Sequence, residues 1–194
     1  MSASDQKRTK PVSYRDLFDL PEHKVGEIVE GELYASPRPS GRHGLSTIVL
    51  AHELVGPFQL GRNGPGGWWI LIEPEIHFGE NVLVPDLAAW RKDRLGDVGA
   101  TYFTTPPDWI CEILSPSTAR LDRIRKMPLY AREGVRHAWL IDPIDRTLET
   151  FVRAGDAWRT ARGYEETEMV RAPPFEDVEI DLSVLWVPGP SAEK

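Results

Sequence analysis

The chain has 194 residues, of which 41% are hydrophobic, and it carries a formal net charge of −7. This length suits one domain, the apolar fraction argues against global disorder, and the acidic balance argues against a protein that coats nucleic acid through bulk charge. The single cysteine, Cys111, excludes an intrachain disulfide and favours a reducing, cytoplasmic location.

The two ends of the sequence differ from its middle. Residues 1–12 are polar and basic and lack the apolar segment that follows in a signal peptide. No later run approaches the roughly 20 apolar residues that a membrane helix needs. We therefore expect a disordered tail at 1–12, a single domain at 13–188, a short tail at 189–194, and no membrane contact.

The first half of the chain alternates turn signals with apolar segments of helical or strand periodicity. Ser13 is a suitable helix cap, Pro57 should kink or end a helix, and Pro85 should interrupt a strand. The expected elements are a short helix at 13–22, two strands within 26–39 around a turn at Glu30-Gly31, a helix at 44–61, and strands at 68–79 and 81–91.

The second half contains two strongly apolar strands, at 108–115 and 137–143. Residues 117–135 lie between them and predict a helix, which Pro128 should break near 125–128. A strand, a helical crossover and a strand predict parallel neighbours. With a hairpin at 147–162 and a last strand or short helix at 178–186, the pattern indicates an α/β or α+β domain whose mixed sheet is flanked by helices.

Glu112 interrupts the apolar strand 109–114 and is the first candidate for a functional residue. It shares a strand face with Ile110 and Leu114, whereas Cys111 points the opposite way and is expected to be a small core residue. A buried, unpaired carboxylate costs several kcal/mol unless a cation, a metal or water compensates. The simplest alternative is a structural ion pair with an arginine.

Two further residues are candidates for the same site. Asp86 follows Pro85, which frees positions of the strand ladder, although an ordinary aspartate in a bend explains it equally well. Lys126 lies four residues after Asp122, so a helical salt bridge is its simplest explanation. The alternative is a catalytic lysine beside the two carboxylates. It lies in a segment, 118–137, with six basic and two acidic residues, which is either a solvated face or a phosphate-binding patch.

Two carboxylates and a lysine are what metal-assisted phosphodiester hydrolysis requires. Carboxylate oxygens bind hard cations such as Mg²⁺, which keeps several of its waters, and the metal activates water and stabilises the leaving oxygen. The five histidines form no tight cluster with one another or with the cysteine, which argues against a zinc site. No motif of a catalytic nucleophile is visible either.

The segments VPDLAAW at 84–90, PDWICEILSPST at 107–118 and WLIDP at 139–143, with Asp122, Lys126 and Tyr130, resemble the Uma-type restriction-endonuclease-like family of the PD-(D/E)xK nuclease superfamily. GEIVEGELYASPRPSGRHG at 26–44 resembles the N-terminal strand pair and following helix of that family. The resemblance covers roughly 14–186, and its motifs are specific as a set.

The resemblance implies a restriction-endonuclease-like mixed β-sheet flanked by helices, with Asp86 and Glu112 as ligands of Mg²⁺ or Mn²⁺. The superfamily usually has its lysine two residues after the second acid, where this chain has Leu114. A lysine moved to the following helix matches Lys126. An N-terminal acid often completes such sites. Glu32 and Glu73 are ranked equally for that role, Glu30, Glu27 and Glu75 compete with them, and Asp122 and Tyr130 are possible additional members of the site.

The expected function is therefore a Mg²⁺-dependent endonuclease acting on nucleic acid, with DNA favoured, in a homodimer. Leu114 motivates an alternative, a nuclease-fold module that serves interaction or regulation with little chemistry. A glycosidase using Asp86 and Glu112 is a weaker third option, because a lysine and a basic helix fit phosphates better than neutral sugars.

Overall fold

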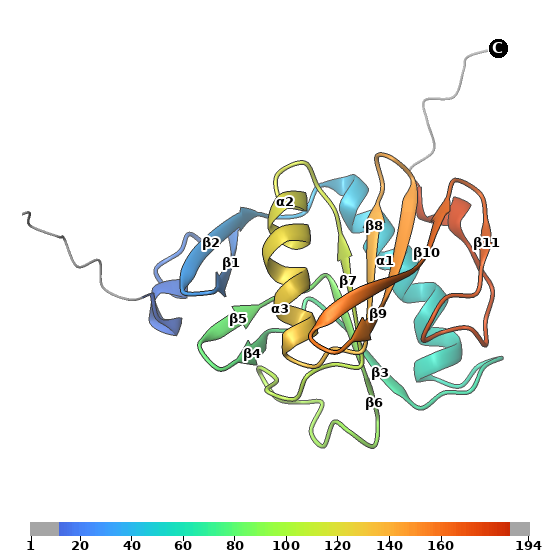
Figure 1. The fold of residues 1–194 in the computed structure, drawn as a ribbon, viewed down its shortest axis with the longest axis horizontal. Coiled ribbons are helices and arrows are strands. Elements are labelled where there is room, and N and C mark those ends of the chain that lie inside the picture. Colours follow the sequence, from blue (N-terminus) through green and yellow to red (C-terminus); the bar gives the residue numbers. More distant parts are fainter. Residues whose placement is uncertain (1–11, 187–194) are drawn as a thin grey trace, which may run out of the picture.

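The computed structural model describes residues 12–186, so the tails expected at 1–12 and 189–194 lie almost entirely outside the described residues. Figure 1 shows a mixed α+β architecture in which two larger sheets adjoin, while β11 and β12 form a separate two-stranded sheet. The predicted fold class is thus confirmed. The elements at the two ends are a 3₁₀ helix at Tyr14–Leu17, β11 at Met169–Val170, β12 at Ile180–Asp181 and a 3₁₀ helix at Leu182–Leu185.

A six-stranded sheet forms the centre, in the order β10-β9-β8-β7-β6-β3. The parallel pair β7–β8 was predicted from the strand–helix–strand order, and the register Trp109↔His137 to Ile113↔Ile141 confirms it. All other neighbours in this sheet are antiparallel. Its strands are β3 (Trp68–Ile72), β6 (Leu87–Arg91), β7 (Trp109–Ile113), β8 (His137–Asp142), β9 (Thr147–Ala154) and β10 (Ala157–Glu165).

Helices cover both faces of this sheet. On one face α1 (Gly41–Leu54) packs Leu50 and Leu54 into a core that includes Cys111 and Ile113. On the other face α2 (Ala119–Leu121) and α3 (Met127–Arg132) lie over a second core that includes Ile110 and Leu114. Strand β7 is therefore buried on both sides, as its nearly continuous apolar sequence requires.

The smaller sheet has the order β2-β1-β5-β4 and is formed by β1 (Lys24–Val29), β2 (Glu32–Pro37), β4 (Ile76–Phe78) and β5 (Asn81–Leu83). The predicted turn between β1 and β2 is confirmed, with Glu30 and Gly31 both at positive φ. This conformation is the one that a two-residue hairpin loop needs, and glycine adopts it without strain.

The two sheets are joined by one bent hairpin. Ile72 pairs with Leu87 in the large sheet, Ile76 pairs with Leu83 in the small sheet, and the Glu73 N–H donates to the Asp86 carbonyl between them at 3.0 Å. The prediction of a single strand at 68–79 is therefore wrong, because the chain passes from one sheet to the other at Pro74. The interruption predicted at Pro85 is the matching crossing on the opposite strand.

The crossover helix continues through residues 119–132 but changes to π geometry at Asp122–Lys126, which overlaps the start of the break predicted near 125–128. A π-helical turn at Asp122–Lys126 separates α2 from α3, and Pro128 lies in the first turn of α3, where a missing N–H costs little. A second π turn, at Val55–Gln59, follows α1 and contains Pro57. Within residues 12–186 no helix is long and apolar enough to span a bilayer.

Candidate functional site

Asp86 and Glu112 lie opposite one another on neighbouring strands. The β6–β7 register pairs Leu87 with Cys111, and continuing it by one residue places Asp86 across from Glu112. Directly opposed residues present their side chains on the same face of a sheet. The Ile113 N–H donates to Asp86 Oδ2 at 2.6 Å, which ties the aspartate to β7. Both acids line a cleft of about 230 Å³ at the junction of the two sheets.

Lys126 lies in the same cleft and is surrounded by carboxylates. Its Nζ is 2.9 Å from Glu112 Oε1, 2.8 Å from Glu27 Oε1 and 3.5 Å from Asp122 Oδ1. The π turn directs both Lys126 and Asp122 inward, where each is almost fully buried. The helical salt bridge with Asp122 therefore exists, but it is the longest of three contacts. The structure thus brings Asp86, Glu112 and Lys126 together.

The burial of these charges sets their pKa values. Desolvation raises the pKa of Glu112 well above its usual value, although the nearby Lys126 opposes this. Desolvation lowers the pKa of Lys126, but the charges of Glu112 and Glu27 outweigh it and raise the pKa well above its usual value, so the ammonium stays protonated. Tyr130 donates its O–H to Glu112 Oε1 at 2.7 Å, and its own pKa is raised well above the usual value, mainly by burial.

The N-terminal acid of the cleft is Glu27, which corrects the ranking of this residue below Glu32 and Glu73. Glu27 is 5% exposed, accepts from the Val84 N–H at 2.8 Å and reaches Lys126 from β1. Glu32 is exposed, accepts from the Tyr34 hydroxyl and does not line the cleft. The reason is position along the hairpin. Glu27 pairs with Tyr34 and Val29 pairs with Glu32, so the two acids share a face, but Glu32 lies beside the turn and outside the cleft lining.

The other acidic candidates divide between the cleft and the surface. Glu73 lines the cleft from the sheet junction and is exposed. Glu75 lies outside the cleft lining and accepts from the Tyr14 hydroxyl and contacts His77, each at 2.7 Å. Glu30 forms ion pairs with Arg125 and Arg132 on the exposed side of α3.

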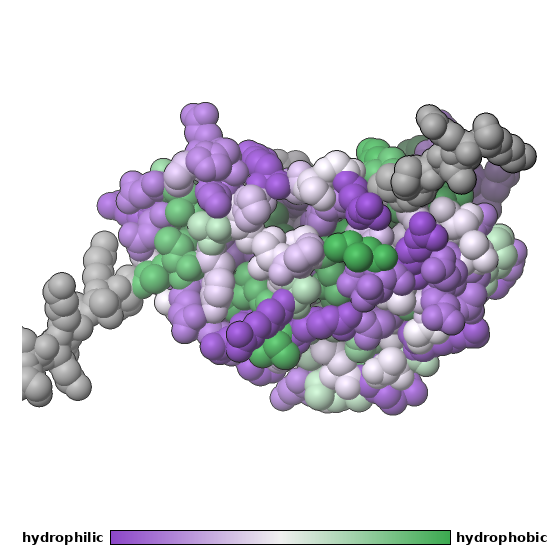
Figure 2. All heavy atoms as spheres, turned by 90° about the horizontal axis from the view of Figure 1, so that it is seen from above, coloured by the Kyte–Doolittle hydropathy of each residue, from purple (hydrophilic) through white to green (hydrophobic). Residues whose placement is uncertain are grey.

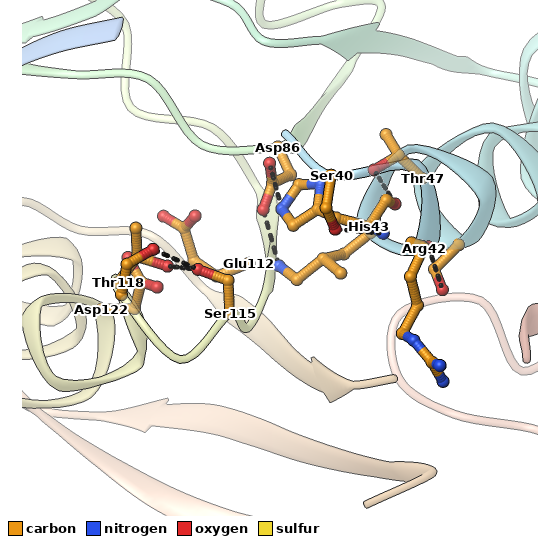
Figure 3. Close-up of polar contacts among 12 residues, drawn as sticks. Ser40, Arg42, His43, Thr47, Asp86, Glu112, Ser115, Thr118 and Asp122 are labelled. Atoms are coloured by element: carbon orange, nitrogen blue, oxygen red, sulfur yellow. Dashed lines mark hydrogen bonds and ion pairs between the residues drawn. The ribbon is translucent and has the colours of Figure 1, made fainter. Parts of the chain in front are cut away.

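His43 is a cleft residue that the sequence reasoning did not place in the site. Its Nε2 is 3.1 Å from Asp86 Oδ1, and Figure 3 shows the two side chains pointing toward one another, from α1 and from the strand junction. Burial lowers the pKa of His43, but the hydrogen bond and charge of Asp86 outweigh it and raise the pKa above its usual value. A lone histidine in SGRHG carries no spacing signal, so only the fold reveals the contact.

Most of the basic residues of 118–137 form ion pairs within the protein. Among the described residues, acidic side chains pair with every one of the six except Arg120. The pairs are Arg123 with Glu149, Arg125 and Arg132 with Glu30, Arg136 with Asp108, and Lys126 with its three acids. The phosphate-binding patch considered for this segment is therefore largely neutralised.

The donor atoms at the cleft suit a hard divalent cation. Asp86 and Glu112 offer carboxylate oxygens, and Mg²⁺ is commonly held by one or two carboxylates while it keeps several waters. Within the described part of the chain no three His, Cys, Asp or Glu side chains are assembled as a complete metal cage. A carboxylate pair lining a cleft fits Mg²⁺, and it does not fit a tetrahedral zinc site.

The family of the chain follows from a comparison with family models. The model described as "Uma2: Putative restriction endonuclease" matches residues 13–184. The chain belongs to the Uma2 family. The resemblance found in the sequence is thereby confirmed, and restriction-endonuclease-like families generally use a divalent metal.

Two known proteins are similar to this Uma2 chain. An uncharacterized protein of Synechocystis sp. (strain ATCC 27184 / PCC 6803 / Kazusa), slr1290, is 29% identical over 120 residues, which are 59% of this chain and 58% of the relative's length. The crystal structure of a "putative nuclease belonging to DUF820" from Anabaena variabilis ATCC 29413 is similar with a TM-score of 0.73 and 22% identity, covering 91% of this chain and 98% of that one. The latter match shows that the fold is shared.

Proposed function

We propose that this Uma2 protein is a Mg²⁺-dependent endonuclease that hydrolyses phosphodiester bonds, with DNA as its substrate. One observation carries the proposal: two carboxylates on neighbouring strands and a buried lysine, whose Nζ is 2.9 Å from Glu112, meet in one cleft. Membership of a family described as restriction endonucleases supports the class of reaction.

Asp86 and Glu112 are the residues that would hold the metal. A bound Mg²⁺ supplies Lewis acidity, which lowers the pKa of water and stabilises the leaving oxygen. The chain itself holds Asp86 through the Ile113 N–H and Glu112 through the Tyr130 hydroxyl. Lys126 keeps its proton and places a fixed positive charge beside the reacting phosphate, where negative charge increases in the transition state.

The test is a calorimetric titration of the full chain with Mn²⁺ and Mg²⁺, together with a plasmid-nicking assay. The variants are Asp86→Asn and Glu112→Gln, which remove charge and keep shape. Glu32→Gln is the matched control, because it makes the same change at an exposed position outside the cleft. We expect metal binding and nicking to be lost in both cleft variants and retained in the control.

Equal nicking by wild type and Glu112→Gln would contradict the assignment of the site. The substrate is tested in the same assay with single-stranded DNA, double-stranded DNA and RNA of one sequence, and RNA cleaved in preference to DNA would contradict that part of the proposal. The expected homodimer stays a prediction, which light scattering of the full chain tests.

A second function is favoured by the state of Lys126. It is 2% exposed and already contacts three carboxylates, which is also the arrangement of a structural ion-pair network. Leu114 stands where the superfamily usually has its lysine. The second function is a nuclease-fold module for interaction or regulation. Such a module would bind metal without nicking any of the three nucleic acids, and that outcome would favour it over the endonuclease.

A further inference from the structure

We infer that His43 is a positioning residue for Asp86, holding this carboxylate in the orientation in which it binds a divalent cation. The inference rests on the metal site of the proposed function and adds a residue to it. It concerns the affinity of the site for metal, so it is measurable without any turnover.

The geometry fixes both oxygens of Asp86 from opposite sides. His43 Nε2 lies 3.1 Å from Oδ1, and the Ile113 N–H donates to Oδ2 at 2.6 Å. Figure 3 shows the Asp86 carboxylate beside the His43 imidazole ring. A carboxylate held at both oxygens cannot rotate freely, and each oxygen keeps a lone pair for a cation in the cleft.

The histidine is itself held firmly by the first turn of α1. The Ser40 side chain accepts from the His43 N–H at 3.4 Å, and the Thr47 hydroxyl donates to the His43 carbonyl at 2.9 Å. This is an ordinary helix start, so the backbone position of His43 does not depend on Asp86.

The polar contacts of the ring are concentrated on its Nε2 side. His43 is 9% exposed, and its Nδ1 is buried without a hydrogen-bond partner in the described residues. An apolar side chain would avoid this unpaired atom, so the imidazole is not explained by packing alone. Its contact with Asp86 explains it, because donors behind a metal-binding side chain orient it, and their removal typically weakens metal binding 10–100-fold.

The experiment is a calorimetric titration of the full chain with Mn²⁺, without nucleic acid. His43→Leu removes the donor, and we expect Mn²⁺ binding to weaken about 10–100-fold. His43→Gln keeps an N–H at similar reach and should retain most of the affinity. His52→Leu, an exposed position on the same helix, is the control and should bind as wild type does.

Urea unfolding of each metal-free variant separates positioning from folding, because a purely structural role would change stability and leave the affinity of the folded protein unchanged. His43→Asn, whose amide is too short to reach Asp86, replaces the leucine variant if that one does not fold.

Two results overturn the inference while the proposed function stands. Wild-type affinity in folded His43→Leu would show that Asp86 needs no support. Equal loss in His43→Gln and His43→Leu would make the imidazole a metal ligand itself. Absence of Mn²⁺ binding in the wild type is a different result, because it overturns the proposed metal site and this inference together.

Discussion

The ammonium of Lys126 is surrounded by more negative than positive charge, since Glu27, Glu112 and Asp122 all contact it inside the protein. Removing one member of a buried ion cluster leaves the others without compensation, which is far more costly than losing an exposed pair. The lysine is thus a structural requirement of the cleft, whatever chemistry it also performs.

Lys126→Met tests this requirement. It keeps the length of the side chain and leaves three buried carboxylates facing each other, so we expect the free energy of unfolding in urea to fall by about 3–5 kcal/mol. Lys24→Met, at a half-buried position outside the cleft, should change it by less than about 0.5 kcal/mol. Similar, small losses in both variants would contradict the ion cluster.

His137 at the start of β8 should make stability depend on pH. Burial lowers its pKa below the usual 6.5, and its Nδ1 is buried without a partner in the described chain. The unfolded chain therefore binds the proton more tightly, so this residue's contribution to stability is lost as pH falls below about 6.5.

The measurement for His137 is urea unfolding at pH 8 and pH 5 of wild type, His137→Gln and the exposed control His52→Gln. The wild type and the control should lose more stability between these pH values than His137→Gln does. Identical losses in all three proteins would show that His137 is not the cause.

The sequence predicts only part of this cleft, for reasons that differ between residues. Glu112 and Asp86 are detectable because a charge in an apolar strand and an acid after a strand proline are locally unusual. Lys126 is detectable only through the family resemblance, which implies a lysine on the following helix. Glu27 was only one of several competing acids and His43 was not a candidate, because the place of each in the cleft depends on how a separate element, β1 or α1, packs in the folded protein.

At the scale of the elements, prolines explain most of what was predicted and what was missed. Pro57 lies within one π-helical turn and Pro128 lies in the first turn after the other, which fits the fact that a proline inside a helix removes a donor and crowds the preceding turn. The residues before and after Pro74 both follow the apolar–polar alternation of a strand. The periodicity therefore did not indicate that they belong to two different sheets. A change of sheet alters tertiary partners, and local sequence carries little record of it.

Glycines of α1 and of the following loop give a matched pair of substitutions. A Cβ at Gly44, within α1, meets nothing within 4 Å, so Gly44→Ala should raise the free energy of unfolding by about 0.5–1 kcal/mol. A Cβ at Gly64 would lie 2.4 Å from Pro57 Cβ and 2.8 Å from its Cα. Gly64→Ala should therefore destabilise the protein, since backbone would have to move.

Thermal and urea unfolding of the two glycine variants measure these opposite effects. A stabilised Gly64→Ala variant would mean that the loop at 60–67 does not pack against the end of the second π turn as described here.

At the scale of the whole molecule, charge is arranged as pairs more than as patches. Polar residues cover most of the face in Figure 2, and apolar residues form small separate groups on it. The chain carries −7 overall, and most basic side chains of 118–137 are already paired with acids. Within 118–137 a nucleic acid would therefore find Arg120 without an acidic partner among the described residues, and the cleft residue Arg38 likewise forms no ion pair there.

This arrangement predicts weakly salt-dependent binding of nucleic acid. With Ca²⁺ in place of Mg²⁺ to prevent cleavage, the slope of log affinity against log salt should correspond to about two or three phosphates. Arg120→Ala should reduce that slope by about one. Fluorescence anisotropy over a salt series measures both, and a slope equivalent to six or more phosphates would mean that the ion pairs exchange partners on binding.

The bent hairpin at Pro74 and Pro85 gives the cleft a mechanical property. Its two strands run through the junction of the sheets, and between the strand pairs the Glu73–Asp86 hydrogen bond crosses it. A small rotation of one sheet against the other about this line would change the distance from Glu27 to Lys126 and leave the pairing inside each sheet intact. The cleft therefore has a wall from each sheet, and a displacement of the β1–β2 hairpin would reach the ammonium of Lys126 through Glu27 and the rest of the crossover helix through the ion pairs of Glu30 with Arg125 and Arg132.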